Sequence, residues 1–420
     1  MISWIYLGVS AWGLLFTISS LVRLRRPAFL LFPYFMGAWV TGELALFHVA
    51  WQAIATIVFV ELGALGHWPG WLGLALAVCS WVGLAYDQRQ AMRAPGALER
   101  ALRAGLGDDY RNGIDQDLAS KLATGLRFGA LARPFHMRDR TVERITDIAY
   151  GDAGKRNLLD VYRLEQRPEQ PMPVLVQVHG GGWVYGNKQQ QALPLLYHLA
   201  ARGWLCVSIN YRLGPRATWP DPVVDVKRAI KWVREHVAEY GGDPNFVVLT
   251  GGSAGGHLAS LAALSPNDPA FQPGFEDVDT TVDACVPLYG VYDVLDRHDS
   301  RVKRGMEWFL TKVLMKRSPD EDREMWDRAS PVSRITPDAP PMFVIHGTYD
   351  SLVFIDDAHE LVAELRAVSR NPVVYAEIPG AQHAFDTFHS VRADATVNAI
   401  GRFLAYVYSA HIAAARERAS

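Results

Sequence analysis

The chain has 420 residues, of which 50% are hydrophobic and 20% charged, and its formal net charge is −2. This length leaves room for a catalytic core plus additional segments, and the near-neutral charge argues against a nucleic-acid surface. The three cysteines, Cys79, Cys206 and Cys285, show no disulfide framework and no metal-ligand spacing.

Charge is distributed unevenly along the chain. Residues 1–86 contain only five charged side chains, which are Arg23, Arg25, Arg26, Glu43 and Glu61. A membrane-spanning helix needs about 20 apolar residues, and residues 2–22 and 62–86 are uncharged. The arginines follow the first run, whereas a cleaved secretory signal has its basic residues before the apolar stretch. Residues 3–22 are therefore predicted to form a retained helix.

The middle of this region allows more than one interpretation. Residues 44–60 could span a membrane when extended to Gly66, and residues 27–42 are apolar but contain Pro33. The second stretch is either a re-entrant or interfacial piece or the start of one long tilted helix. With a last span at about residues 71–86, the prediction for residues 1–86 is a transmembrane region of three spans, with four as the alternative.

The number of spans decides on which side the rest of the chain lies. Basic residues next to spans favour the cytoplasm, so the arginines at 23–26 should face it. Three spans also place the basic residues after position 87 in the cytoplasm, whereas four spans would place them outside. We therefore expect an integral protein of the cell membrane with a cytoplasmic catalytic domain. Glu43, inside the apolar region, is either a functional residue or an interfacial residue at a helix end.

Residues 87–140 are polar and mostly helical in pattern, and they are predicted to form a linker or membrane-proximal segment. Leu98, Leu102 and Leu106 recur every four positions and give one apolar stripe. This helix is expected to lie either on the membrane or against the catalytic domain.

From residue 141 to 420 the pattern alternates between strands and helices, which predicts an α/β fold with a mostly parallel sheet. The strand-like runs are 145–150, 158–162, 174–178, 204–210, 246–250, 284–288, 342–345 and 373–378. The central runs are nearly continuously hydrophobic, as expected for parallel strands covered on both faces. No helix separates the first two runs, so we expect them to form an antiparallel edge. Residues 291–340 interrupt the pattern and are a possible lid or insertion.

Two glycine-rich motifs follow strand-like runs. Residues 251–255 read Gly-Gly-Ser-Ala-Gly, which places Ser253 on a strained turn between a strand and a helix. Residues 179–183 read His-Gly-Gly-Gly-Trp, and the backbone N–H groups of such a loop can hold an oxyanion. Ser253 is the predicted nucleophile, with Gly180, Gly181 and Ala254 as oxyanion donors.

The catalytic partners of the serine are expected on later strand ends, in the order acid and then histidine. Asp350 follows the run 342–345, and His383 follows the run 373–378. Both loops should lie at the carboxyl edge of the sheet, where sites on such sheets collect. His383 would take the serine proton and Asp350 would orient the imidazole. The rivals are His389 as the base, and Asp356 and Asp357, which fit better at a helix N-terminus.

These motifs resemble those of a known group of enzymes. Residues 179–183, 210–213, 251–257, 346–350 and 380–383 look like the motifs of α/β-hydrolase esterases of the hormone-sensitive lipase and feruloyl-esterase-like (BD-FAE) type. The resemblance covers about residues 144–410, and it implies the α/β-hydrolase fold and the triad of Ser253, Asp350 and His383.

The N-terminal region resembles that of actinobacterial membrane-bound Lip-type carboxylesterases. One departure concerns the catalytic acid. Many lipase-branch members have Asp-Pro-Leu around it, whereas this chain has Asp350-Ser-Leu. This difference moves the chain toward the feruloyl-esterase-like branch.

A bulky apolar set lies within residues 291–340. Met306, Trp308 and Phe309 of this set, together with Trp183, are the predicted substrate-binding residues. Flexible methionines suit varied acyl chains. The alternative is that the set belongs to an ordinary packed helix.

These features predict a membrane-anchored serine carboxylic ester hydrolase that acts on hydrophobic or lipid esters through an acyl-serine, with no metal and no other cofactor. Acyl transfer, or amide or formamide hydrolysis, by the same triad is the first alternative. The alternative of another class is a catalytically silent membrane scaffold on a hydrolase fold. The expected partners are an ester substrate and membrane lipids, and not nucleic acid.

Overall fold

The computed structural model describes residues 1–23, 28–123, 125–298 and 305–419. Its largest unit is an eight-stranded sheet with the strand order β1-β2-β4-β3-β5-β6-β7-β8. The strands are β1 (Val142–Ala149), β2 (Leu158–Leu164), β3 (Met172–Val178), β4 (Leu205–Ile209), β5 (Gly242–Gly252), β6 (Ala284–Leu288), β7 (Met342–Gly347) and β8 (Val373–Ile378). The predicted antiparallel edge is confirmed, since β1 pairs with β2 in antiparallel orientation. The pairs from β4 to β8 are all parallel.

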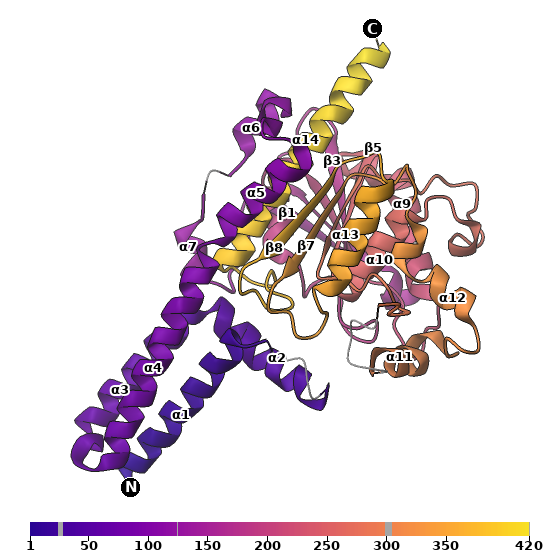
Figure 1. Ribbon diagram of the computed structural model, residues 1–420. Coiled ribbons are helices and arrows are strands. Elements are labelled where there is room, and N and C mark those ends of the chain that lie inside the picture. Colours follow the sequence, from indigo (N-terminus) through magenta and orange to yellow (C-terminus); the bar gives the residue numbers. More distant parts are fainter. Residues whose placement is uncertain (24–27, 124, 299–304, 420) are drawn as a thin grey trace.

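Helices cover both faces of this sheet, which confirms the predicted α/β fold (Figure 1). One face packs against α9 (Asp221–His236), α10 (Ala254–Leu264) and α13 (Asp356–Val368). The other packs against α5 (Ala94–Leu106), α8 (Leu193–Ala200) and α14 (Val391–Ala419). Val176 and Leu175 of β3 belong to the two opposite clusters, and both are fully buried. Burial on both faces explains why the central strands are hydrophobic at successive positions.

The N-terminal region contains α1 (Ile2–Leu21), α2 (Ala28–Glu43), α3 (Ala45–Glu61) and α4 (Trp68–Ala91). Two helices are long and apolar enough to span a membrane, namely α1 and the helical stretch that starts with α4. A third span could be formed by α2 and α3 together, but only as a pair bent by 90°. Figure 1 shows α2 leaving the bundle of α1, α3 and α4 and running toward the catalytic domain. The bend excludes one long tilted helix over residues 27–60. Arg25 and Arg26 lie outside the described residues.

In the bundle of α1, α3 and α4, polar side chains lie inside and apolar side chains lie outside, which is the opposite of the sheet domain. Small and polar side chains make the helix–helix contacts: the hydroxyl oxygens of Thr17 and Ser80 are 2.7 Å apart. Tyr6 donates to the hydroxyl of Thr56 at 3.1 Å. Large apolar side chains are exposed instead, among them Trp12, Ile54, Ile57 and Val82. This arrangement is typical of helix bundles in lipid, and it indicates that the protein is associated with a membrane.

α4 and α5 form a nearly continuous rod from the bundle to the sheet (Figure 1). Leu98 and Leu102 are fully buried in the cluster that also contains residues of β8 and α14. A Cβ added to Gly105 would lie 2.9 Å from the Cα of Val374, so this helix lies directly on β8. Of the two predicted placements, the structure shows the helix against the catalytic domain. The short helices α6 (Gln116–Lys121) and α7 (Phe128–Leu131) follow.

The predicted insertion lies between β6 and β7. It contains α11 (Gly305–Leu310) and α12 (Arg323–Arg328), while residues 299–304 lie outside the described residues. Leu310, Leu314 and Trp326 are buried in the same cluster as the residues of α9 and α10. The described part of the insertion is therefore packed onto that face of the domain.

Candidate active site

Ser253 lies between the end of β5 and the start of α10, as the motif predicts. Its backbone has φ 58° and ψ −124°, a conformation that is strained for a residue with a Cβ and that is typical of functional turns. Glycines on both sides permit the turn. A Cβ on Gly255 would lie 2.0 Å from the carbonyl oxygen of Val178, and one on Gly251 would lie 2.5 Å from the backbone of Gly255. The Ser253 side chain is half-buried at the carboxyl edge of the sheet.

Asp350 and His383, from the loops after β7 and β8, lie in direct contact. The Oδ2 atom of Asp350 and the Nδ1 atom of His383 are 2.6 Å apart, and both side chains are buried. Burial alone would raise the pKa of Asp350, but the charge and hydrogen bond of His383 and a hydrogen bond from His346 outweigh it and hold this pKa below its usual range. The carboxylate therefore stays ionised and keeps Nδ1 as a donor, which leaves Nε2 to accept a proton.

Two residues that the sequence reasoning did not assign to the site support this pair. The Nε2 atom of His346, in β7, is 3.3 Å from the Oδ2 atom of Asp350. The Oε1 atom of Gln382 accepts from the backbone N–H groups of Ser351 at 2.7 Å and of His383 at 2.9 Å. One amide oxygen thus joins the acid loop to the histidine loop. Both residues lie within the motifs at 346–350 and 380–383, but only the folded loops bring their side chains to the pair.

The rival residues lie in other contacts. The Nδ1 atom of His389 is 2.7 Å from the Oδ1 atom of Asp394, and the backbone N–H of His389 donates to Pro134. Asp356 and Asp357 are the first residues of α13. The structure therefore joins His383, and not His389, to Asp350.

The loop after β3 passes beside the Ser253 turn. A Cβ on Gly180 would lie 3.1 Å from the Cβ of Ser253. Gly181 has φ +114°, and a Cβ there would lie 2.1 Å from a backbone carbonyl oxygen, so only glycine fits. The N–H of Gly180 donates to the Oε1 atom of Gln191 at 2.6 Å, so one of the three predicted donors is already engaged. Within the described ranges, no protein acceptor takes the N–H of Gly181 or Ala254, and these two groups are available to an oxyanion.

His179 and Tyr211 hold this loop in place. The Nδ1 atom of His179 is 2.7 Å from the carbonyl oxygen of Gly180, and the rings of His179 and Tyr211 stack with centroids 4.3 Å apart. The Tyr211 hydroxyl donates to the carbonyl oxygen of His179 at 2.9 Å. Burial lowers the pKa of His179 to about 4, so this imidazole is neutral near pH 7 and has a structural role.

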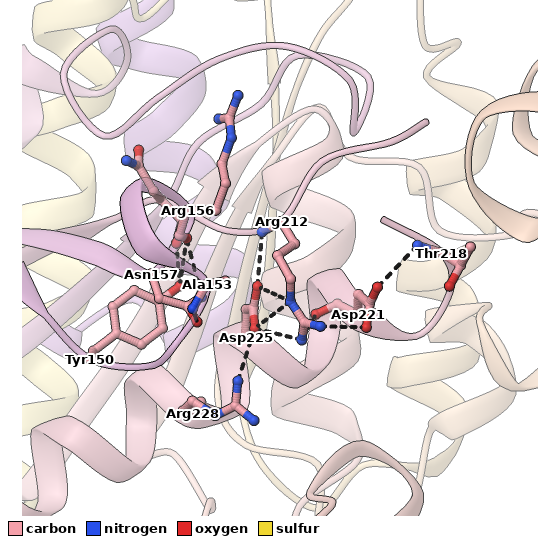
Figure 2. A network of polar contacts seen from close by, with 10 residues as sticks. Tyr150, Ala153, Arg156, Asn157, Arg212, Thr218, Asp221, Asp225 and Arg228 are labelled. Atoms are coloured by element: carbon pink, nitrogen blue, oxygen red, sulfur yellow. Dashed lines mark hydrogen bonds and ion pairs between the residues drawn. The ribbon is translucent and has the colours of Figure 1, made fainter. Parts of the chain in front are cut away.

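Arg212, the residue after Tyr211, pairs with Asp221 and Asp225 of α9, as Figure 2 shows. Its guanidinium donates to both carboxylate oxygens of Asp225, at 2.8 and 2.9 Å. A third N–H group donates to Asp221 at 2.6 Å. Both acids lie near the start of α9, so the fork of Arg212 ties the loop after β4 to that helix. The motif at residues 210–213 therefore supports the oxyanion loop and does not enter the site itself.

Tyr289, directly after β6, is a site residue that no motif predicted. The centroids of the Tyr289 and His383 rings are 4.6 Å apart, and the Tyr289 hydroxyl donates to the carboxylate of Asp386. A Cβ on Gly252 would lie 2.6 Å from the hydroxyl oxygen of Tyr289. Tyr289 therefore contacts both His383 and the residue before Ser253. The neighbouring strands β3, β5, β6, β7 and β8 each deliver one part of the site to the same edge of the sheet.

The predicted substrate-binding residues lie in different environments. Trp183 is 2% exposed, and its indole N–H donates to the Nδ1 atom of His257 at 3.2 Å within the core. Met306 also packs against the core cluster. Phe309 approaches the oxyanion loop, since its ring is 3.7 Å from a Cβ placed on the third glycine of that motif. Trp308 is exposed to the surroundings. Phe309 thus lies beside the oxyanion loop, whereas Trp183 is turned into the core, and a contact of Trp308 with a substrate stays a prediction.

Metal ligation and cysteine chemistry are not indicated at this edge. Among the residues that the structure describes, no group of three or more His, Cys, Asp or Glu side chains is arranged to hold a metal ion. Cys206 and Cys285 are buried in the sheet, and Cys79 lies in the N-terminal bundle.

Known proteins share this sequence pattern and this fold. The BD-FAE family model matches residues 159–365. The chain is 47% identical to the probable carboxylic ester hydrolase LipM of Mycobacterium tuberculosis, over 80% of this chain and 78% of that protein. It is 43% identical to the esterase LipQ of the same organism, over 77% of each chain. The alignment with LipM covers 342 residues, more than residues 141–420 contain, so it also includes part of the chain before residue 141.

A solved structure shares the arrangement of the catalytic domain. The butyrate-bound esterase Est2 of Thermogutta terrifontis is 26% identical, with a TM-score of 0.51. The match covers 68% of this chain and 97% of that chain.

Proposed function

The chain belongs to the BD-FAE family of α/β-hydrolase esterases and is a carboxylic ester hydrolase, and we propose that it is a membrane-anchored serine enzyme that cleaves hydrophobic or lipid esters through an acyl-serine. Ser253 is the nucleophile, His383 the general base and Asp350 its partner. The observation that carries this proposal is the 2.6 Å contact between Asp350 and His383, at the sheet edge that also carries the strained Ser253 turn.

In the proposed reaction, the Oγ atom of Ser253 attacks the ester carbonyl carbon while the Nε2 atom of His383 takes its proton. Asp350 stabilises the imidazolium that forms. The N–H groups of Gly181 and Ala254 hold the developing oxyanion, and loss of one such donor costs about 3–4 kcal/mol in other enzymes. The imidazolium then gives its proton to the leaving alcohol oxygen as the C–O bond breaks. Water, activated by the same imidazole, releases the acid from the acyl-serine.

Membrane anchoring is supported by the packing of α1, α3 and α4. Their interior is small and polar and their exterior apolar, as described above, and two helices are long and apolar enough to span a membrane. We place the catalytic domain on the cytoplasmic side because four arginines follow the last apolar stretch, at positions 89, 93, 100 and 103. Anchoring brings the site next to esters that partition into the bilayer.

A fluorophosphonate probe tests the nucleophile, because it reacts with activated serines. The full-length protein should be labelled, and the Ser253→Ala variant should not. Ser120→Ala is the matched control, since Ser120 lies on α6, away from the sheet edge, and it should be labelled like the wild type. Equal labelling of the Ser253→Ala variant would contradict the assignment.

Product analysis tests the reaction. With a long-chain ester in detergent micelles, we expect free acid as the product, and the same product when a competing alcohol is added. Transfer of the acyl group to that alcohol would identify the enzyme as a transferase. Faster cleavage of a matched amide would identify an amidase.

Alkaline carbonate extraction of membranes tests the anchor, and release of the protein into the supernatant would contradict it.

A further inference from the structure

We propose that α2 forms one wall of the substrate site and that Phe35 contacts the apolar chain of the ester, so that a helix of the N-terminal region determines the chain-length preference of the enzyme. This inference rests on the proposed function, because it concerns the same site. The ligand it implies is an ester with a long apolar chain that resides in the membrane.

The first observation is the contact between α2 and His383. The ring centroids of Phe35 and His383 are 5.9 Å apart, with an angle of 79° between the ring planes. Phe35 is only 6% exposed. Trp39, one turn further along α2, stacks on Phe35 at 5.6 Å and lies 5.4 Å from Phe388. An apolar row therefore begins at the catalytic imidazole and continues along α2.

The second observation is that Arg23, before α2, and Glu43, its last residue, both contact the catalytic domain. Before α2, the guanidinium of Arg23 is 3.6 Å from the carboxylate of Asp356 and lies over the ring of Phe354. Phe354 follows the loop that carries Asp350. This contact holds the segment after α1 beside the acid loop.

The C-terminal end of α2 is held by Arg392 of α14, which is fully buried. Arg392 pairs with Glu43, the last residue of α2, at 3.4 Å and with Asp87 of α4 at 2.5 Å. Ser390 also donates to Glu43, at 2.6 Å. The Nε atom of Arg392 donates to the carbonyl oxygen of Pro379, in the loop that carries His383, at 2.8 Å. Glu43 therefore joins α2 to the histidine loop.

The third observation is the orientation of α2. It is bent by 90° from α3, and Figure 1 shows it running from the bundle toward the catalytic domain. Its exposed side chains are apolar: they include Leu30 and Met36 as well as Phe32, which is 64% exposed and whose ring is 6.1 Å from that of Phe35. A helix that lies across the spans with an exposed apolar face fits the membrane interface. An ester chain lying along α2 would reach the site from the lipid without crossing water.

Phe35→Ala in the full-length protein tests this inference, with Leu30→Ala on the same helix as the matched control, because Leu30 is exposed and lies on another face of α2. The assay compares kcat/KM for p-nitrophenyl laurate and p-nitrophenyl acetate in the same micelles. Phe35→Ala should lower the laurate-to-acetate ratio by about tenfold, the order expected for loss of an apolar contact with a phenylalanine. Leu30→Ala should leave the ratio within about twofold. Phe35→Leu should keep most of the wild-type ratio because an apolar wall remains.

The outcomes separate this inference from the proposed function. An unchanged ratio in Phe35→Ala, with Ser253→Ala inactive, would overturn the role of α2 and leave the esterase intact. An equal loss for both esters would also overturn it, because that is the effect of a structural residue beside His383. Full activity of Ser253→Ala would overturn the proposed function instead. If Phe35→Ala does not fold, the laurate-to-acetate ratios of Phe35→Leu and Phe35→Trp are compared with each other instead. Identical ratios in these two variants would reject the inference.

Discussion

The sheet domain and the N-terminal bundle use the same amino acids in opposite ways. In the sheet domain, valine and leucine fill the interior on both sides of the central strands. In the bundle, apolar side chains point outward, while Thr17, Ser80 and Gln52 lie between the helices. The hydrophobic effect drives the first arrangement, whereas lipid offers no such driving force between helices and favours close contact of small and polar groups. Apolar side chains inside the sheet domain indicate that water surrounds it, whereas apolar side chains on the outside of the bundle indicate that lipid surrounds the bundle.

The two regions meet at the proposed catalytic site. The sheet edge supplies Ser253, Asp350 and His383, and α2 supplies Phe35 against the imidazole. Arg392 pairs with acids from α2 and α4. The N-terminal region is thus part of the structure around the proposed site.

The largest effect should come from the histidine at the sheet edge. We expect His383→Gln to lower kcat/KM by about 10³-fold or more, since the serine loses its base. His389→Gln is the matched control, because His389 is also buried beside a carboxylate but is paired with Asp394. Its kcat/KM should stay near that of the wild type. A loss in His389→Gln with activity retained in His383→Gln would reverse the assignment.

The next effect concerns the junction between the two regions. Arg392→Met leaves Glu43 and Asp87 buried without their cation, which should lower the free energy of unfolding by about 3–5 kcal/mol. Arg370→Met is the control, because its ion pair with Asp338 is exposed and should contribute about 0–1 kcal/mol. Thermal unfolding in detergent measures both. Equal shifts in the two variants would show that the junction does not hold the regions together.

A pair of exposed valines tests the opposite packing of the two regions directly. Val82 in α4 is 67% exposed and Val368 in α13 is 37% exposed. An aspartate in the middle of a spanning helix costs about 2.5–3.5 kcal/mol, whereas a change on a water-facing surface is usually within about 0.5 kcal/mol. Val82→Asp should therefore reduce the fraction of protein in carbonate-washed membranes, and Val368→Asp should not. Equal behaviour of the two variants would place both surfaces in water.

The smallest effect concerns a buried cation in the sheet domain. Lys227 is fully buried and donates to the carbonyl oxygen of Ser265 and, at 3.0 Å, to the hydroxyl of Thr280. Burial lowers the pKa of Lys227 from 10.5 to about 7. The unfolded chain then binds more protons than the folded chain between these values, so stability should rise with pH across this window, by about 1 kcal/mol per pH unit.

Thermal unfolding of wild type and Lys227→Met at several pH values checks this prediction. The variant lacks the titrating amine, so the part of the pH dependence between about pH 7 and 10.5 that belongs to Lys227 should disappear. The same slope in both proteins would show that Lys227 is not the group responsible.

Short-range patterns were enough to predict the strands, the order of the motifs and the nucleophile turn. The glycines around Ser253 are required by neighbours within the same strand–turn–helix unit and by the adjacent strand, so they carry a local signal. The contrast between residues 1–86 and the rest of the chain is likewise visible in composition, because each region must match its solvent.

Contacts between distant segments carried no such signal. The pairing of Asp350 with His383 and the contact of Tyr289 with His383 follow from loops that meet only after β6, β7 and β8 align. The bend between α2 and α3, and with it the contact of Phe35 with His383, spans almost the whole chain. Neither side chain differs locally from any other buried aromatic or histidine, so their meeting depends on the way the two regions pack and not on the residues around each of them.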